Sequence, residues 1–197
     1  MSSIQRLYVR KKENFREEEA RLFDALSECL GEKLTAVALY HRYDVEGLSG
    51  EEYEKAEVTV FSEPPVDAVY RDCPTGDMVI ASEFLPGQYD QKADSAEQCL
   101  SILTQHDGIH VRCAEIYVLS GDFSETDRAK AVKFLINPVE SREASLDPVS
   151  TLKMEFDEPA AVATVSGFRD MDDAGLAALL SEMGLAMSPA DLKFIQK

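Results

Sequence analysis

Cysteine is scarce in this 197-residue chain, and its four thiols, Cys29, Cys73, Cys99 and Cys113, contain no C-x-x-C pair. A structural zinc site is therefore not expected, because such sites need closely spaced ligand pairs. Cys29 and Cys99 fall on the apolar faces of predicted helices and Cys113 falls in a predicted strand. We expect buried, reduced thiols that pack as small hydrophobic groups.

Long apolar runs are also missing. No stretch of about 18 apolar residues occurs, which excludes a conventional membrane span. The first residues, MSSIQRLYVRKKENF, carry charges where a signal peptide needs an apolar segment. These two observations predict a cytoplasmic protein that does not associate with membranes.

Basic residues are in the minority. There are 20 Lys and Arg against 37 Asp and Glu, for a formal net charge of −17. Nucleic acid is therefore not expected as a partner, because neutralising phosphates requires clustered Lys and Arg. The one local exception is Arg6, Arg10, Lys11 and Lys12, which we interpret as a solvated strand end rather than an anion site.

What the chain does have is 45% hydrophobic residues, enough for a real core, and a repeated order of elements. Within residues 4–72 the patterns predict a strand at 7–10, a helix ending near Gly31 and a long strand at 35–47. A second helix starts at the capping-box pair Ser49 and Glu52, stops before Pro64, and precedes a closing strand at 66–70.

Residues 78–147 show the same order, with a strand at 79–85, a capping box at Ser95 and Gln98, and Gly108 in the place of Gly31. A strand at 110–121 and a helix capped by Ser124 follow. Matching segments lie roughly 73 to 77 residues apart, far beyond solenoid periods. We therefore predict an α+β fold: a duplicated β-α-β-α-β unit, or pseudo-dimer, with repeats at about 4–72 and 78–147, in a first domain of residues 1–150. Two ordinary α+β units that are alike by chance are the alternative.

Residues 151–197 lose this pattern and predict an extended connector followed by a truncated helical linker domain. Asp172 begins a helix that ends at Gly184, and Ser188 begins a second. Leu192, Phe194 and Ile195 on that last helix have little to pack against in this chain, which we expect to stop in mid-element. Exposed apolar residues there predict self-association of the fragment.

Metal binding is not expected from the histidines or the aspartates. His106 and His110 are four residues apart, but the Asp-Gly turn between them keeps the rings off a common helix face. Asp170, Asp172 and Asp173 resemble the start of a calcium loop, yet the glycine and glutamate that such a loop requires do not follow. Helix capping explains these aspartates better.

Catalytic motifs are equally absent. The sequence contains no G-x-S-x-G, no P-loop and no G-x-G-x-x-G, and no Cys–His pair with an orienting acid stands out. His41 lies inside a predicted strand, where a structural hydrogen bond is favoured over catalysis. We therefore predict no catalytic residue and no metal site in this stretch.

Several polar segments are more specific than a generic surface, although turns and helix caps explain most of their residues. They are RYDVEG (42–47), TVFSEPPVD (59–67), FLPGQYDQKADSAEQC (84–99) and INPVESREASL (136–146). In this order, and with EMGLAMSPADLKFIQK (182–197), they resemble the large, single-chain form of the phosphoribosylformylglycinamidine synthase family. The resemblance covers essentially the whole chain.

The resemblance implies both an architecture and a role. In that family the amino-terminal domain resembles two copies of the small accessory subunit of the multi-subunit enzymes, and a linker domain follows it. The full enzyme converts formylglycinamide ribonucleotide, ATP and glutamine into formylglycinamidine ribonucleotide, ADP, phosphate and glutamate, in de novo purine synthesis. Its magnesium- and ATP-dependent synthetase and its glutaminase, with a cysteine nucleophile, lie downstream. No catalytic residue and no cofactor can therefore be carried over to this stretch.

The implied role is a scaffold that couples the synthetase and glutaminase domains, its expected partners, and shields ammonia passing between them. The candidate contacts toward those domains are Arg42, Asp44, Glu46, Gln88, Asp90, Gln91 and Asp94. The alternative is a free-standing accessory subunit or adaptor module that bridges a synthetase and a glutaminase. An independent small enzyme is disfavoured by the missing motifs.

Overall fold

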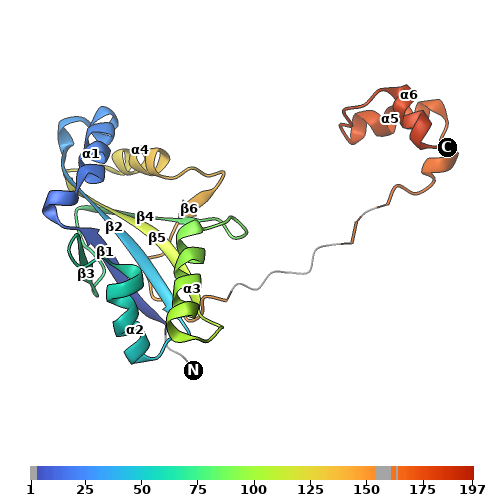
Figure 1. Cartoon of the computed structure of the whole chain (residues 1–197). Helices are drawn as coiled ribbons and strands as arrows, with labels where there is room; N and C mark the ends of the chain where they lie inside the picture. The colour runs from blue at the N-terminus through green and yellow to red at the C-terminus, as the bar shows by residue number, and fades with distance from the viewer. Residues whose placement is uncertain (1–3, 154–160, 163) are drawn as a thin grey trace. The chain divides into compact units, whose positions relative to one another are not determined.

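The chain divides into two compact units, unit 1 (Met1–Met154) and unit 2 (Glu155–Lys197). The computed structural model describes residues 4–153, 161–162 and 164–197 (Figure 1). Unit 1 carries an antiparallel sheet with helices packed on it, so the predicted α+β class is confirmed.

The sheet has six strands in the order β3-β1-β2-β5-β4-β6. Their bounds are β1 (Gln5–Lys11), β2 (Leu34–Glu46), β3 (Asp67–Tyr70), β4 (Met78–Phe84), β5 (His110–Gly121) and β6 (Ser141–Glu143). The long strands β2 and β5 form the centre, paired from Leu34 opposite Gly121 to Glu46 opposite His110. Along the chain the order is β1-α1-β2-α2-β3 and then β4-α3-β5-α4-β6.

Four helices cover one face of this sheet: α1 (Glu17–Leu30), α2 (Gly50–Ala56), α3 (Gln91–Thr104) and α4 (Glu125–Leu135). The last turn of α2 continues as a π-helical stretch, Glu57–Phe61. Figure 1 shows α1 beside α4 at one end of the sheet and α2 beside α3 at the other. Strand side chains alternate between faces, and odd-numbered residues of β2 contribute to the clusters under both helix pairs. Both pairs therefore lie on the same face.

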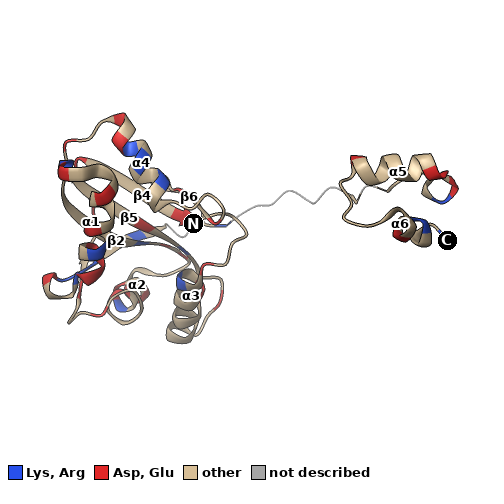
Figure 2. Ribbon diagram, turned by 90° about the horizontal axis from the view of Figure 1, so that it is seen from above, with Lys and Arg blue, Asp and Glu red and all other residues tan. Residues whose placement is uncertain are grey.

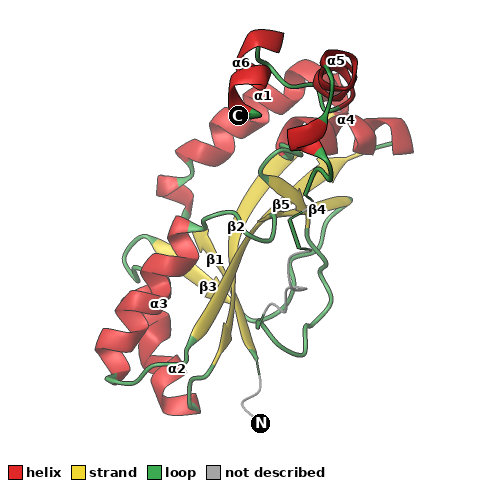
Figure 3. Cartoon of the chain, turned by 90° about the vertical axis from the view of Figure 1, so that its right-hand side faces the viewer, coloured by secondary structure: helices red, strands yellow, loops and turns green. Residues whose placement is uncertain are grey.

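The core consists of two clusters beneath the helices and a third on the opposite face. Val45 and Leu100 belong to the cluster under α2 and α3, and Leu26 and Leu39 belong to the cluster under α1 and α4. The opposite face buries Tyr8, Ile116 and Ala144 and is covered by loop segments rather than helices (Figure 3).

Most predicted helix ends are confirmed. Gly31 follows α1 with a φ of 65°, a conformation that favours glycine. Capping boxes begin α2 at Ser49 and α4 at Ser124. The ends of α3 differ from the prediction. It begins four residues before Ser95, because the Asp90 carboxylate accepts hydrogen bonds from the backbone N–H groups of Lys92 and Ala93, and Gln105 rather than Gly108 is its left-handed cap.

The predicted burial of the cysteines is only partly right. Cys113 is buried and Cys29 half-buried, whereas Cys99 and Cys73 are exposed. Cys99 precedes the fully buried Leu100 on α3, so it points away from the core that Leu100 fills.

The basic residues Arg6, Arg10, Lys11 and Lys12 are only partly a solvated strand end. Arg10 Nε lies 2.7 Å from Glu19 of α1, and Lys11 Nζ lies 2.8 Å from Asp67 of β3. Arg6 pairs with buried Asp44. Lys12, just after β1, is exposed and donates to the carbonyl oxygen of Pro64 at 2.6 Å. The interpretation therefore holds for Lys12, whereas each of the other three cations has a carboxylate on a neighbouring element.

Unit 2 contains a short 3₁₀ turn, Phe168–Asp170, and two helices, α5 (Asp173–Glu182) and α6 (Pro189–Ile195). Asp172 and Ser188 cap the two helices as predicted. Leu192 is only 3% exposed, so the expectation that it lacks packing is wrong, because α6 packs on α5. Part of the predicted connector, residues 154–160 and 163, lies outside the described residues. Among the residues that are described, no helix has the length and apolar character needed to cross a bilayer.

Candidate functional site

Two of the seven predicted contact residues, Arg42 and Asp44, lie inside unit 1. Both residues were predicted as contacts toward other domains, and both were placed in a long strand, which is β2 of the structure. Arg42 is 2% exposed and Asp44 is fully buried. Arg42 Nε lies 3.2 Å from Asp44 Oδ2, and Arg6 also donates to Asp44. Neither buried side chain can form a contact surface in this conformation.

The segment after β6 covers this buried ion cluster. Arg42 Nη1 donates to the carbonyl oxygen of Ser145 at 2.7 Å, and Arg6 Nη1 donates to that of Leu146 at 2.7 Å. These carbonyl oxygens accept hydrogen bonds from guanidinium N–H groups that are not bound to a carboxylate. The cluster therefore attaches the end of unit 1 to the sheet.

Glu46, the third predicted contact residue on β2, holds the same segment farther along. Its carboxylate accepts from the Leu152 backbone N–H at 2.8 Å and from the Thr151 hydroxyl at 3.2 Å. These hydrogen bonds, first of all the one from Leu152, lower the pKa of Glu46. Leu152 is 6% exposed. Unit 1 thus extends a few residues beyond the predicted boundary at residue 150, because Glu46 binds residues 151–152.

The other four predicted residues lie in and after the turn that joins β4 to α3. Gln88 and Gln91 are exposed. Asp90 is the cap of α3, and Asp94 accepts hydrogen bonds from Tyr89 Oη at 2.8 Å and Gln98 Nε2 at 2.7 Å. Two of these four are therefore engaged locally, while the two glutamines are available at the surface.

A pocket of 450 Å³ brings the loop and the exit segment together. Gln88 and Asp90 line it from the loop, Leu152 lines it from the exit segment, and Arg112 lines it from β5. Glu46 positions Leu152 there through its backbone hydrogen bond. The predicted loop therefore lies beside the exit segment that Glu46 holds, although none of residues 42–47 lines the pocket itself.

Two titratable groups of the central strands, Cys113 of β5 and His41 of β2, have strongly shifted pKa values. Burial raises the pKa of the Cys113 thiol, which keeps it protonated and weakly nucleophilic at neutral pH. Burial, assisted by the Lys92 ammonium, lowers the pKa of His41 to about 4, so its ring is neutral at pH 7. The ring Nδ1 lies 3.0 Å from Lys92 Nζ, in keeping with the structural role predicted for His41.

Two buried-strand contacts were missed by the sequence interpretation. Glu19 of α1 accepts from the Leu39 N–H at 3.0 Å, and Glu97 of α3 accepts from the Val111 N–H at 2.7 Å. In each case the shorter neighbouring strand, β1 or β4, has already ended its pairing with the central strand before this N–H is reached. Glu19 is one of three consecutive glutamates, Glu17, Glu18 and Glu19, in the first turn of α1. A glutamate on the inner face of an amphipathic helix is the signal that could have separated Glu19 from the others.

No group of three or more His, Cys, Asp or Glu side chains that could hold a metal ion occurs in the described part of the chain. The arrangement combines an exposed loop, a pocket beside it and an exit segment held by hydrogen bonds. No protein-family model and no curated protein matches this chain.

Proposed function

We propose that this chain is the amino-terminal scaffold of a phosphoribosylformylglycinamidine synthase of the single-chain type, in the cytoplasm. In this proposal unit 1 is the accessory-subunit-like domain and unit 2 begins the linker domain. The stretch catalyses nothing alone. It supports the conversion of formylglycinamide ribonucleotide, ATP and glutamine by holding downstream synthetase and glutaminase domains together.

The observation that carries the proposal is the symmetry of element order in unit 1. Reading outward from the central pair, β2 is followed by β1 and β3 on one side, and β5 by β4 and β6 on the other. Each half has the order β-α-β-α-β, and its second helix starts with a capping box. This arrangement favours a duplicated unit over two unrelated α+β halves.

The central-strand contacts support duplication independently. In each half the helix that follows the first strand supplies a glutamate, Glu19 or Glu97, to an N–H of the long strand. In each half the shorter strand, β1 or β4, stops pairing with the long strand before it reaches that N–H. A buried N–H without a partner costs roughly 1–3 kcal/mol, so both halves meet the same requirement in the same way.

The scaffold role follows from what the surface offers. The loop around Gln88 lies beside the pocket that Leu152 closes, close to the point where the chain leaves unit 1. An exposed loop anchored by a helix cap can contact another domain without rearranging the core.

Gln88 provides the sharpest test, in a full-length enzyme that contains this segment. Gln88→Ala should lower glutamine-dependent turnover by several-fold and leave ammonia-dependent turnover unchanged, because only the first reaction needs coupled domains. The control is Glu54→Ala, a change at an exposed residue of α2 that does not line this pocket. Asp90 is less suitable, since its replacement would also remove the cap of α3.

Two outcomes would contradict the proposal. One is an equal loss of both activities in Gln88→Ala, which would indicate damage to the synthetase rather than to coupling. The other is unchanged glutamine-dependent turnover, which would remove the loop from the contact surface. Thermal unfolding of both variants shows whether either result comes from lost stability.

A further inference from the structure

Unit 1 has a second and larger concave surface, a groove of 840 Å³ on the helical face of the sheet. We call it the α3–α4 groove. Its floor includes Tyr43, Glu115 and Tyr117, while Cys99 of α3 and Phe134 of α4 lie on opposite walls. The space is large enough for several side chains of a partner.

Large apolar side chains around the α3–α4 groove are unusually exposed. Phe84 is 45% exposed, Tyr89 is 69% exposed and Phe134 is 50% exposed, and all three line the groove. Neighbouring exposed aromatic residues on a concave surface are typical of a protein interaction site. Apolar contacts of this kind provide anchoring positions for a partner.

The charge of the groove specifies the partner further. Three acidic residues, Asp90, Glu115 and Glu140, line it against the single ammonium of Lys92, whereas the carboxylate of Glu83 pairs with Arg142 and Arg42 and lies on the opposite face of the sheet. That ammonium is already engaged by the structure, because it lies 3.0 Å from the His41 ring and 3.6 Å from Glu115. The groove therefore presents an excess of negative charge beside its aromatic residues.

We propose that the α3–α4 groove binds a cationic amphipathic helix of a partner protein. The apolar side of such a helix, with residues at i, i+3, i+4 and i+7, would pack on Phe84 and Phe134, and its Lys or Arg residues would face Glu115 and Glu140. A second copy of this chain is a poor occupant, because it carries a net charge of −17. Acidic residues lie on several elements of unit 1 rather than on one of them (Figure 2). This inference does not depend on the proposed function.

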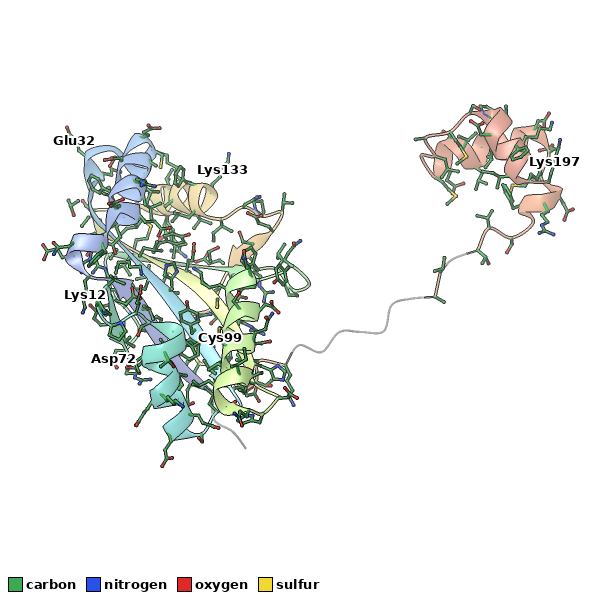
Figure 4. All side chains as sticks on the ribbon, in the orientation of Figure 1. Lys12, Glu32, Asp72, Cys99, Lys133 and Lys197 are labelled. Carbon is green, nitrogen blue, oxygen red and sulfur yellow. The ribbon has the colours of Figure 1, made fainter. Side chains whose placement is uncertain are left out.

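Two exposed cysteines provide a probe of the groove and a control within the same chain. Cys99 lies on α3 and lines the groove, whereas Cys73 is exposed in the loop after β3, next to the Asp72 labelled in Figure 4. The probes are two synthetic peptides of about 14 residues, roughly four helical turns, with leucines at the same helical spacing. One carries lysines on its polar side and the other carries glutamates.

The measurement is the rate of N-ethylmaleimide addition to each cysteine of the full chain, followed by mass spectrometry. A saturating lysine peptide should slow addition at Cys99 by about tenfold, because thiol reactivity follows access, and leave Cys73 unchanged. The glutamate peptide should protect neither cysteine. Equal protection of both cysteines, protection by both peptides or no protection by the lysine peptide would each overturn the proposal.

Substitutions then assign the contacts. Phe134→Ser and Glu140→Gln should each weaken protection of Cys99, raising the peptide concentration required by about fivefold. The matched controls are Ile102→Ser, a 78% exposed residue of α3 outside the groove, and Glu32→Gln in the exposed 3₁₀ turn Gly31–Lys33 that follows α1. Controls that weaken protection as much as the groove variants would contradict the assigned site, and circular dichroism shows whether all four variants are folded.

Discussion

The fold strongly lowers the pKa of His41. Its ring lies in β2 near charged groups from four other elements: Lys92 of α3, Glu115 of β5, Lys11 of β1 and Asp67 of β3. Burial is the largest cause of its lowered pKa, followed by the Lys92 ammonium. The folded pKa is about 4, against about 6.5 in an unfolded chain.

This difference predicts a loss of stability on acidification. Between pH 6.5 and 4 the unfolded chain binds a proton at His41 that the folded chain does not, so stability falls as pH falls through this window. The expected loss between pH 7 and 5 is about 2 kcal/mol from this group. His41→Gln should therefore unfold in urea with a smaller difference between pH 7 and pH 5 than the unchanged protein.

His106 is a control with the opposite sign. Its hydrogen bonds, first to the Asp107 carbonyl and then to Glu52, raise its pKa. The stability it contributes is present below pH 6.5 and is lost as pH rises through the folded pKa. His106→Gln should therefore increase the sensitivity to acid that His41→Gln decreases. Changes of the same sign in both variants would contradict these assignments.

For single residues, contacts made within one turn of the chain were predictable from the sequence, and contacts between distant segments were not. Capping residues such as Ser49 and Ser124 were predictable because their contacts are made within one turn of the chain. Arg42 and Asp44 were misplaced because their neighbours, Arg6 and the carbonyl of Ser145, are far away in sequence. A charged residue in a strand looks exposed until the segment covering it is known.

At the scale of elements, the exit segment is attached to the sheet rather than merely adjacent to it. Glu46 accepts from both Thr151 and Leu152, just before Lys153, a cleavage site for trypsin. Glu46→Ala should release residues 151–153 and speed tryptic cleavage after Lys153 by about fivefold, since proteases act on locally opened backbone. Cleavage after Arg169 in unit 2 should not change, and peptide mass spectrometry reports both rates in one sample.

The matched control for this prediction is Glu51→Ala, a change at an exposed glutamate in the first turn of α2. Glu46→Gln should behave between Glu46→Ala and the unchanged protein, because the amide oxygen can still accept from Leu152. Unchanged cleavage after Lys153 in Glu46→Ala would mean that Arg6 and Arg42 hold the segment without Glu46.

Element order was the most predictable feature, and element ends were less so. Five of the six strands of unit 1 were anticipated within a few residues, all but the short edge strand β6, because apolar alternation is a local signal. The start of α3 was missed because Asp90 and Ser95 are both acceptable caps, and only the backbone decides between them. The α3–α4 groove had no sequence signal, since its walls come from segments that meet only in the folded sheet.

At the scale of the whole molecule, the two units each have their own interior. Unit 1 buries three apolar clusters, whereas α5 and α6 of unit 2 share the buried residues Leu176 and Leu192. Phe194 of unit 2 is 78% exposed and Ile195 is 59% exposed. This small unit therefore leaves much of its apolar surface in water, which favours self-association through α6.

A chain shortened after Lys153 should lose this self-association and keep the unfolding midpoint of unit 1. In the full chain, a net charge of −17 opposes association, so added salt should promote it by screening the repulsion. Phe194→Ser in the full chain should have nearly the effect of the truncation, whereas Lys197→Ser should have little. Sedimentation equilibrium at low and high salt measures the result. A full chain that stays monomeric at both salt concentrations would contradict the assignment of α6 as an associating surface.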